Sequence, residues 1–202
     1  MIPPRIVLAT ANPGKVIELR ELLSPWAPVE VLSLESFPGL ALPAESETSY
    51  ADNAVAKARA VALATGLPAL GDDSGLEVER LGGRPGVRSA RLAASDPERI
   101  RKLLDALADA PAGARRATFR CVVALVWPDG RTETAEGVCP GSIAPAPSGG
   151  EGFGYDPVFV PDQLGHTFAD ASREEKQRLS HRARAVRALG AHLALRAAGG
   201  PC

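Results

Sequence analysis

The 202-residue sequence is poor in cysteine, contains no long apolar run and carries no excess of one charge. Its three cysteines, Cys121, Cys139 and Cys202, are odd in number and form no Cys-x-x-Cys pair. That pattern argues against a disulfide framework or a zinc cluster and is typical of a reducing compartment. No run approaches the ~18 apolar residues of a membrane span, and Met1–Thr10 lacks the features of a signal peptide. We therefore expect a soluble, cytoplasmic protein without a membrane partner.

The formal net charge of -1 leaves the chain without the global basic field on which non-specific nucleic-acid binders rely. An RNA-binding protein is therefore disfavoured, and an anion site has to be local. Only four of the 23 basic residues are lysines. Because the chain otherwise uses arginine, each lysine is a candidate for a specific role. These are Lys15, Lys57, Lys102 and Lys176.

The length suits one α/β domain over residues 1–202. Periodicity and turn residues predict strands at Arg5–Thr10, Val29–Leu34, within Pro68–Leu81, at Ala117–Trp127 and near Arg131–Val138. The last two form an antiparallel hairpin around Pro128-Asp129-Gly130. Helices are predicted at Lys15–Leu23, Ser49–Thr65, Asp96–Ala108 and from Arg173 to about Arg196, with a possible restart at Ser180. The expected fold is a central mixed, strongly twisted β-sheet flanked by helices and carrying this long hairpin.

The first segment that suggests chemistry is A-T-A-N-P-G-K, from Ala9 to Lys15, between a strand and a helix. A helix N-terminus presents free N–H groups with a partial positive charge, and a lysine in the first turn adds a point charge, so the turn suits a phosphate. The Walker A spacing is absent. A capped turn with a surface lysine is the simpler alternative.

The second segment is G-D-D-S-G, Gly71–Gly75. Two adjacent carboxylates are poor core material, because unpaired buried charge is strongly penalised. On extended backbone Asp72 and Asp73 point to opposite sides. Carboxylates are the usual ligands of Mg²⁺, which also bridges to substrate phosphate. The alternative is an Asp-rich turn.

The third set lies near the C-terminal end: G-F-G-Y-D-P at Gly152–Pro157, then Lys176, then Ser180–Arg182. A flat ring could stack on Phe153 or Tyr155 while basic side chains read a purine edge or grip phosphates. The alternative is a turn with core aromatics beside a solvated basic helix face.

Taken in order, these motifs resemble the inosine/xanthosine triphosphate pyrophosphatase family. The resemblance joins T-A-N-P-G-K, S-Y-A-D-N-A-x-x-K-A, D-D-S-G-L-E-V-x-x-L-G-G-x-P-G-V-x-S-A-R, G-F-G-Y-D-P-V-F and R-E-E-K-x-x-x-S-H-R, and spans about Ile6 to Leu193. It implies a magnesium-dependent homodimer that cleaves ITP, dITP and XTP to the monophosphate and pyrophosphate. The chain departs from the family at Glu45–Tyr50, which reads E-S-E-T-S-Y where many members have E-T-G-x-T-F, and at Ala11, where glycine is common.

The resemblance also implies roles for individual residues. Asp73 is the proton acceptor for the attacking water, and the metal ligands are Glu45 and Asp73, with Asp72 nearby. The phosphate end is bound by Thr10, Ala11, Asn12, Pro13, Gly14, Lys15, Asn53 and Lys57. The rest of the nucleotide is bound by Ser74, Phe153, Gly154, Tyr155, Asp156, Lys176, His181 and Arg182.

Specificity follows from hydrogen bonding, since donors aimed at a 6-oxo group leave the 6-amino group of adenine unpaired. Rejection of guanosine does not follow, because guanosine shares the O6/N1–H edge. Two alternatives stay open: a pyrophosphatase for modified pyrimidine or methylated nucleotides, and a non-catalytic nucleotide-binding module.

Overall fold

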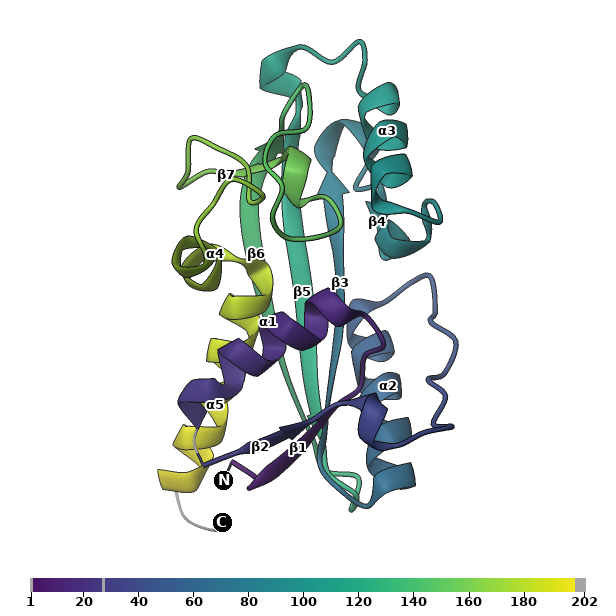
Figure 1. Cartoon of the computed structure of the whole chain (residues 1–202), viewed down its shortest axis with the longest axis vertical. Helices are drawn as coiled ribbons and strands as arrows, with labels where there is room; N and C mark the ends of the chain where they lie inside the picture. The colour runs from purple at the N-terminus through teal and green to yellow at the C-terminus, as the bar shows by residue number, and fades with distance from the viewer. Residues whose placement is uncertain (1, 27, 199–202) are drawn as a thin grey trace. The chain divides into compact units, whose positions relative to one another are not determined.

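A computed structural model describes residues 2–26 and 28–198, and Figure 1 traces them. The strands are β1 (Arg5–Leu8), β2 (Glu30–Leu32), β3 (Ala69–Val78), β4 (Pro85–Gly86), β5 (Arg116–Val126), β6 (Thr132–Ile143) and β7 (Phe159–Pro161). The helices are α1 (Pro13–Leu23), α2 (Tyr50–Thr65), α3 (Asp96–Ala106), α4 (Arg173–Leu179) and α5 (His181–Ala198).

The strands form a mixed sheet in the order β2-β1-β3-β5-β6-β7, with β4 paired to β3. Strands β2 and β3 are parallel to β1, whereas β4 is antiparallel to β3 and β7 is antiparallel to β6. A short turn joins the neighbouring strands β5 and β6, where the N–H of Trp127 donates to the carbonyl of Arg131. The predicted α/β class, the mixed sheet and the hairpin are confirmed, although β6 runs further than expected.

The chain forms two compact units. The first unit consists of Met1–Asp73, Cys121–Gly137 and Arg182–Cys202, and the second of Ser74–Arg120 and Val138–His181. Strands β3, β5 and β6 each contribute residues to both units. A single domain over residues 1–202 stays a prediction.

In the first unit, α2 packs closely on β3 because both contribute small residues. The Ser49 hydroxyl caps α2 by accepting from the N–H of Asp52, and Gly66 ends the helix in the left-handed conformation. A Cβ placed on Gly71 of β3 would lie 2.1 Å from the carbonyl oxygen of Ala54 in α2. Glycine at position 71 therefore permits this contact. The buried small side chains of α2 are Ala54, Ala58, Val61 and Ala62.

Helices α1 and α5 share a second apolar cluster with the first unit's strands. The spacing of Leu19 and Leu23 places both on one face of α1, where neither is more than 1% exposed. Leu70 of β3 belongs to this cluster, whereas its neighbour Gly71 faces α2. Consecutive residues of β3 thus alternate between the α1/α5 side and the α2 side, as strand geometry requires. The other members include Ile6, Leu8, Val123, Leu125, Val186, Leu189 and Leu193.

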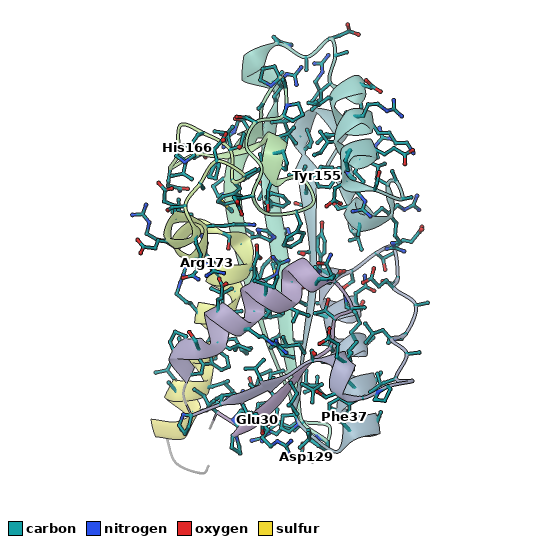
Figure 2. All side chains as sticks on the ribbon, in the orientation of Figure 1. Glu30, Phe37, Asp129, Tyr155, His166 and Arg173 are labelled. Carbon is teal, nitrogen blue, oxygen red and sulfur yellow. The ribbon has the colours of Figure 1, made fainter. Side chains whose placement is uncertain are left out.

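The second unit has its own core, built on α3 and aromatic side chains. Ile100, Leu103 and Leu107 are buried, as the helical spacing in the sequence predicts. The Phe119 and Phe159 ring centroids lie 4.5 Å apart. Tyr155 is buried, whereas the His166 side chain is 41% exposed (Figure 2). This core supports the loop that contains Phe153–Asp156.

The predicted helix restart at Ser180 is confirmed. Helix α4 ends at Leu179 and α5 begins at His181, with Ser180 extended between them. Glycine-flanked Asp72 and Asp73, expected within a loop and strand, lie wholly inside β3. None of the helices in the described residues has the length and apolar character needed to cross a membrane.

Candidate active site

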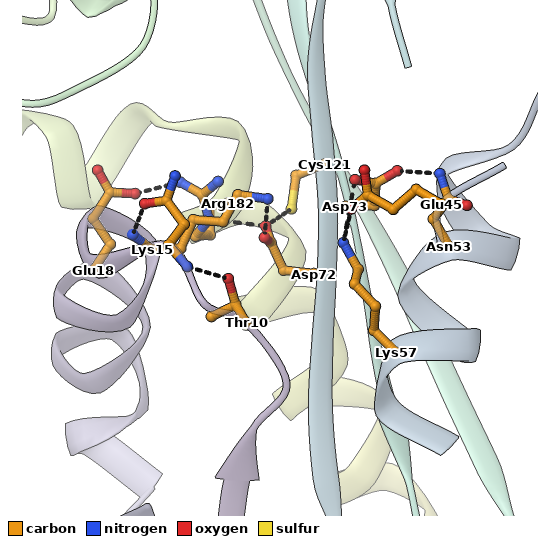
Figure 3. A network of polar contacts seen from close by, with 11 residues as sticks. Thr10, Lys15, Glu18, Glu45, Asn53, Lys57, Asp72, Asp73, Cys121 and Arg182 are labelled. Atoms are coloured by element: carbon orange, nitrogen blue, oxygen red, sulfur yellow. Dashed lines mark hydrogen bonds and ion pairs between the residues drawn. The ribbon is translucent and has the colours of Figure 1, made fainter. Parts of the chain in front are cut away.

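Asp72 and Asp73 lie on opposite sides of β3, as their alternation on extended backbone predicts (Figure 3). Both side chains are almost completely buried, with Asp72 0% and Asp73 4% exposed. A buried carboxylate needs hydrogen bonds or a counter-charge. Each of the two obtains these from a different set of first-unit residues, so the pair forms two distinct polar clusters.

On the α2 side, Asp73 is held by Asn53 and Lys57. The Asn53 amide donates to Oδ2 of Asp73 at 2.8 Å, and Nζ of Lys57 lies 3.4 Å from Oδ1. Lys57 Nζ also donates to Oε1 of Glu45 at 2.7 Å. Because Asn53 and Lys57 are four residues apart, one face of α2 presents both groups to β3. We call Glu45, Asn53, Lys57 and Asp73 the carboxylate cluster.

Burial raises the pKa of Asp73, although Lys57 and the hydrogen bond from Asn53 oppose the shift. For Lys57, burial lowers the pKa, but the negative charges of Asp73, Asp72 and Glu45 outweigh it, so the pKa rises. The ammonium therefore stays charged between two carboxylates. A carboxylate whose pKa is raised towards neutrality is a better proton acceptor than an ordinary aspartate.

The Glu45 loop is fixed by the same Asn53. Its Oδ1 accepts from the N–H of Ser46 at 2.7 Å, and its Nδ2 donates to the Ser46 carbonyl at 3.1 Å. No non-glycine residue in the described chain has a positive φ. The loop backbone at Glu47, the position where many family members have glycine, is therefore one that a residue other than glycine can adopt.

On the other side of β3, Asp72 is bound by cations. Nε of Arg182 donates to Oδ2 of Asp72 at 2.9 Å, and Lys15 forms an ion pair with Oδ1. The Cys121 thiol also donates to Oδ2, at 3.2 Å, and Arg182 forms a second ion pair with Glu18. Burial would raise the pKa of Asp72, but Arg182 and Lys15 hold it well below its usual range.

This placement bears on two of the sequence-based predictions, which concern Asp72 and Arg182. Asp72 lies on the opposite side of β3 from the carboxylate cluster and is neutralised by Lys15 and Arg182, which argues against a role as a magnesium ligand. Arg182, interpreted as a base-reading residue, is 2% exposed and bound to Asp72 and Glu18. In this arrangement its guanidinium links Asp72 of β3 to Glu18 of α1.

The predicted phosphate turn is a capped helix start. Oδ1 of Asn12 accepts from the N–H of Lys15 at 3.1 Å, and Oγ1 of Thr10 accepts from the N–H of Asn12 at 3.2 Å. Pro13 occupies the first helical turn, where its missing N–H has no cost. The first turn contains no acidic side chain. Ala11, Asn12 and Pro13 are exposed, while Gly14 and Lys15 are partly buried, so the turn faces solvent.

In the second unit, Asp156 brings together two of the predicted base-binding residues, Phe153 and Lys176. Its Oδ2 accepts from the Phe153 N–H at 2.9 Å and from Nζ of Lys176 at 2.5 Å. The same Nζ lies 5.2 Å from the Phe153 ring centroid. His181 stacks on Phe119 with ring centroids 4.5 Å apart and is 6% exposed. Ser74 is partly exposed on β3.

Two residues around Asp72 and Arg182, Glu18 and Cys121, are not predicted from the sequence as part of the site. Glu18 lies three residues after Lys15 on α1, a spacing that marks neighbours on a helix and could have drawn attention to it. Cys121 lies in a valine-rich strand and reads as an ordinary small apolar residue. No local signal indicates that its thiol contacts Asp72, 49 residues away.

The donor set determines which metal could bind. Among the described residues, no group of three or more His, Cys, Asp or Glu side chains could hold an ion by itself. Glu45 and Asp73 are two carboxylates joined through Lys57. One or two carboxylates combined with substrate phosphates and water form the usual Mg²⁺ site. The two residues therefore fit magnesium that arrives with a nucleotide.

Comparison with known proteins agrees with the resemblance seen in the sequence. A dITP/XTP pyrophosphatase of Thermus thermophilus is 50% identical over 189 residues, covering 92% of this chain and 89% of that protein. The structure of a HAM1 protein from Coxiella burnetii superposes with a TM-score of 0.80 at 40% identity, covering 94% and 98% of the two chains. A dITP/XTP pyrophosphatase from Mycobacterium abscessus gives 0.72 at 42%, covering 93% and 96%.

The sequence profile of the Ham1 family matches residues 6–192, which is nearly the whole described chain. The expected family membership is thereby confirmed. The chain belongs to the Ham1 family.

Proposed function

We propose that the protein hydrolyses ITP, dITP and XTP to the nucleoside monophosphate and pyrophosphate. The observation that carries the proposal is Asp73, a buried carboxylate with a raised pKa that is fixed by Asn53 and Lys57. The choice of substrate is supported by the Ham1 family to which the chain belongs and by the name of a relative that is 50% identical, a dITP/XTP pyrophosphatase.

In the proposed reaction, a water oxygen forms a bond to the α-phosphorus while the bond from that phosphorus to the bridging oxygen of the β-phosphate breaks. Asp73 accepts the water proton, and pyrophosphate leaves. Asn53 keeps Asp73 in place through Oδ2, and the Lys57 ammonium contacts Oδ1. Lys57 stabilises the negative charge of the phosphates.

The phosphate end is assigned to the first unit, with Lys15 and the turn from Thr10 to Gly14. The Lys15 ammonium is held at the start of α1 by Asp72, and its side chain is 14% exposed. A fixed cation at a helix N-terminus suits an anionic ligand. Asp72 is then a positioning residue for Lys15. Asn12 keeps its amide nitrogen for a phosphate, since its Oδ1 caps the helix.

Glu45 and Asp73 would hold Mg²⁺, as their donor chemistry allows. Bound magnesium would neutralise charge on the transferred phosphate oxygens.

The base end is assigned to the second unit, to Ser74, Phe153–Asp156, Lys176 and His181. Phe153 offers a ring face, while Lys176 supplies a donor suited to a 6-oxo group. Reading by Arg182 would require its guanidinium to leave Asp72 and Glu18. We further propose a cytoplasmic homodimer.

A pyrophosphate-release panel tests the substrate assignment. ITP, dITP, XTP, GTP, ATP, TTP and UTP are assayed with and without Mg²⁺. The proposal predicts release from the 6-oxo substrates ITP, dITP and XTP in preference to ATP, and only with the metal. Preference for TTP or UTP would favour a pyrimidine pyrophosphatase, and absence of any turnover would favour a nucleotide-binding module.

A further inference from the structure

The loop that carries Phe153 is hydrogen-bonded to the segment from Ser89 to Asp96. The proposed function gives this segment no role. The N–H of Gly154 donates to Oδ2 of Asp96 at 2.7 Å, and the Tyr155 hydroxyl donates to the carbonyl of Ser89 at 3.0 Å. Asp96 begins α3, and Ser89 belongs to the S-A-R sequence before it. Two adjacent loop residues are thus tied to this segment, all within the second unit.

Asp96 is itself fixed, which makes it a firm anchor. Arg99 forms an ion pair with Oδ1 of Asp96, and Nε of Arg99 donates to the Ala93 carbonyl at 2.9 Å. One carboxylate oxygen therefore faces Arg99 and the other faces Gly154. Because the guanidinium and the loop take different oxygens, the carboxylate is constrained on both sides.

Both peptide planes that flank Phe153 are held by carboxylates. The Phe153 N–H donates to Asp156 at 2.9 Å, and the next N–H along the chain, that of Gly154, donates to Asp96. The orientation of these two planes determines φ and ψ of Phe153, and hence the direction of its Cα–Cβ bond. Asp96 and Asp156 together therefore fix the backbone from which the Phe153 ring projects.

The glycines on either side show how tightly the loop is built. Gly152 has a φ of +79°, and a Cβ there would lie 2.2 Å from Oδ2 of Asp156. Gly154 has a φ of +64°, in the left-handed region that favours glycine. The loop conformation thus depends on glycine at both positions. The hydrogen bond from Gly154 to Asp96 holds a backbone of this defined conformation in place.

We propose that Asp96 is a positioning residue for nucleobase recognition, which holds the Phe153 ring for stacking through the Gly154 N–H. The inference rests on the proposed function, in which Phe153 contacts the base. Asp96 touches neither substrate nor reacting atoms in this role. Its loss therefore weakens binding of the nucleoside end and leaves binding of the phosphate end unchanged.

The test compares Asp96→Ala and Asp96→Asn with Asp105→Ala, a control on the same helix whose exposed carboxylate pairs with Arg101. For each variant we would measure kcat and KM with ITP, and the inhibition constants of inosine monophosphate and pyrophosphate. Thermal melting and circular dichroism verify folding.

For Asp96→Ala we expect KM for ITP and the inhibition constant of inosine monophosphate to rise roughly tenfold, the scale of losing one charge-assisted hydrogen bond. The inhibition constant of pyrophosphate and kcat should change by less than about twofold. Asp96→Asn keeps an acceptor oxygen and should restore most of the affinity. If Asp96→Ala does not fold, Arg99→Ala, which frees one side of the carboxylate, provides a milder version of the same loss.

An unchanged inhibition constant for inosine monophosphate in Asp96→Ala would overturn the inference, as would an equal rise for inosine monophosphate and pyrophosphate. Failure of the proposed function is distinguishable from these outcomes, because it is seen in the wild-type protein. A wild-type protein that neither hydrolyses ITP nor binds inosine monophosphate would overturn both.

Discussion

Asn53 donates a hydrogen bond of 2.8 Å to the carboxylate of Asp73, and with the rest of the same amide it pairs with both backbone groups of Ser46. One buried side chain thus joins the proposed general base to the loop that carries Glu45. The family resemblance implies that Asn53 lines the phosphate end, and its hydrogen bonds also make it a positioning residue within the carboxylate cluster.

Replacing Asn53 with aspartate should shift the pH dependence of the reaction. Burial already raises the pKa of Asp73 above its ordinary 3.8, and activity is lost as the pH falls through the raised value. A second carboxylate beside Asp73 raises that pKa further, so the acidic limb of the kcat/KM profile should move up by about one pH unit or more. Rate profiles between pH 5 and 9 measure this. Asp52→Asn on the exposed side of α2 serves as the control, and an unmoved limb in Asn53→Asp would contradict the role of Asp73.

Replacing Asp72 with asparagine should destabilise the first unit. Asp72 is fully buried and paired with Lys15 and Arg182, and removing one partner of such a pair costs about 3–5 kcal/mol. Because the folded state lowers the pKa of Asp72, its stabilisation is complete above the unfolded value and declines as the pH falls towards the folded one. The difference between wild type and variant in urea unfolding should therefore shrink by about 1 kcal/mol from pH 7 to pH 3. The control Asp109→Asn, at an exposed position, should show no such difference from wild type. If Asp72→Asn were as stable as wild type at pH 7, the stabilising role of Asp72 would be refuted.

Gly71→Ala tests the contact between β3 and α2. The added Cβ would meet the backbone oxygen of Ala54 at 2.1 Å, and that carbonyl cannot move without disturbing the helix. The expected loss is about 3 kcal/mol of unfolding free energy. The matched control is Gly113→Ala, where a Cβ has nothing within 4 Å. Equal melting temperatures for the two variants would be inconsistent with this packing.

Glu45→Gln tests the proposed metal ligand. The substitution keeps the size of the side chain and removes its charge, so magnesium should bind less tightly and the Mg²⁺ concentration for half-maximal rate should rise at least roughly tenfold. The neighbouring exposed Glu47→Gln should behave like wild type. Activity should disappear with EDTA and return with Mg²⁺ in all three proteins. An unchanged Mg²⁺ requirement in Glu45→Gln would remove Glu45 from the metal site.

Local patterns predict those parts of the fold and candidate site that depend on local geometry. Strand alternation predicts that Asp72 and Asp73 face opposite sides, and the serine at position 180 indicates the break between α4 and α5. The pairing of Asp72 with Arg182 joins residues 110 positions apart, and that of Asp96 with Gly154 joins residues 58 apart. Such contacts depend on tertiary packing, which no local pattern specifies.

The different surroundings of Asp72 and Asp73 have the same origin. In the sequence, the two adjacent aspartates look like equivalent candidates for a metal ligand or a base. They differ only in the side chains that contact each of them in the folded protein. Lys15 and Arg182 neutralise Asp72, whereas Asp73 forms an ion pair with Lys57, whose ammonium also pairs with Glu45. The cations supplied by α1 and α5 thus decide which aspartate can act as a base.

The most direct test compares pyrophosphate release from ITP by the wild-type protein and by Asp73→Asn in the presence of Mg²⁺, with ITP affinity measured by calorimetry in Ca²⁺. The asparagine retains the shape of the side chain but cannot accept the water proton at neutral pH. We predict that wild type releases pyrophosphate and that kcat of Asp73→Asn falls roughly a hundredfold or more, while ITP affinity changes only a few-fold. Unchanged turnover in Asp73→Asn would contradict the assignment of Asp73 as the proton acceptor.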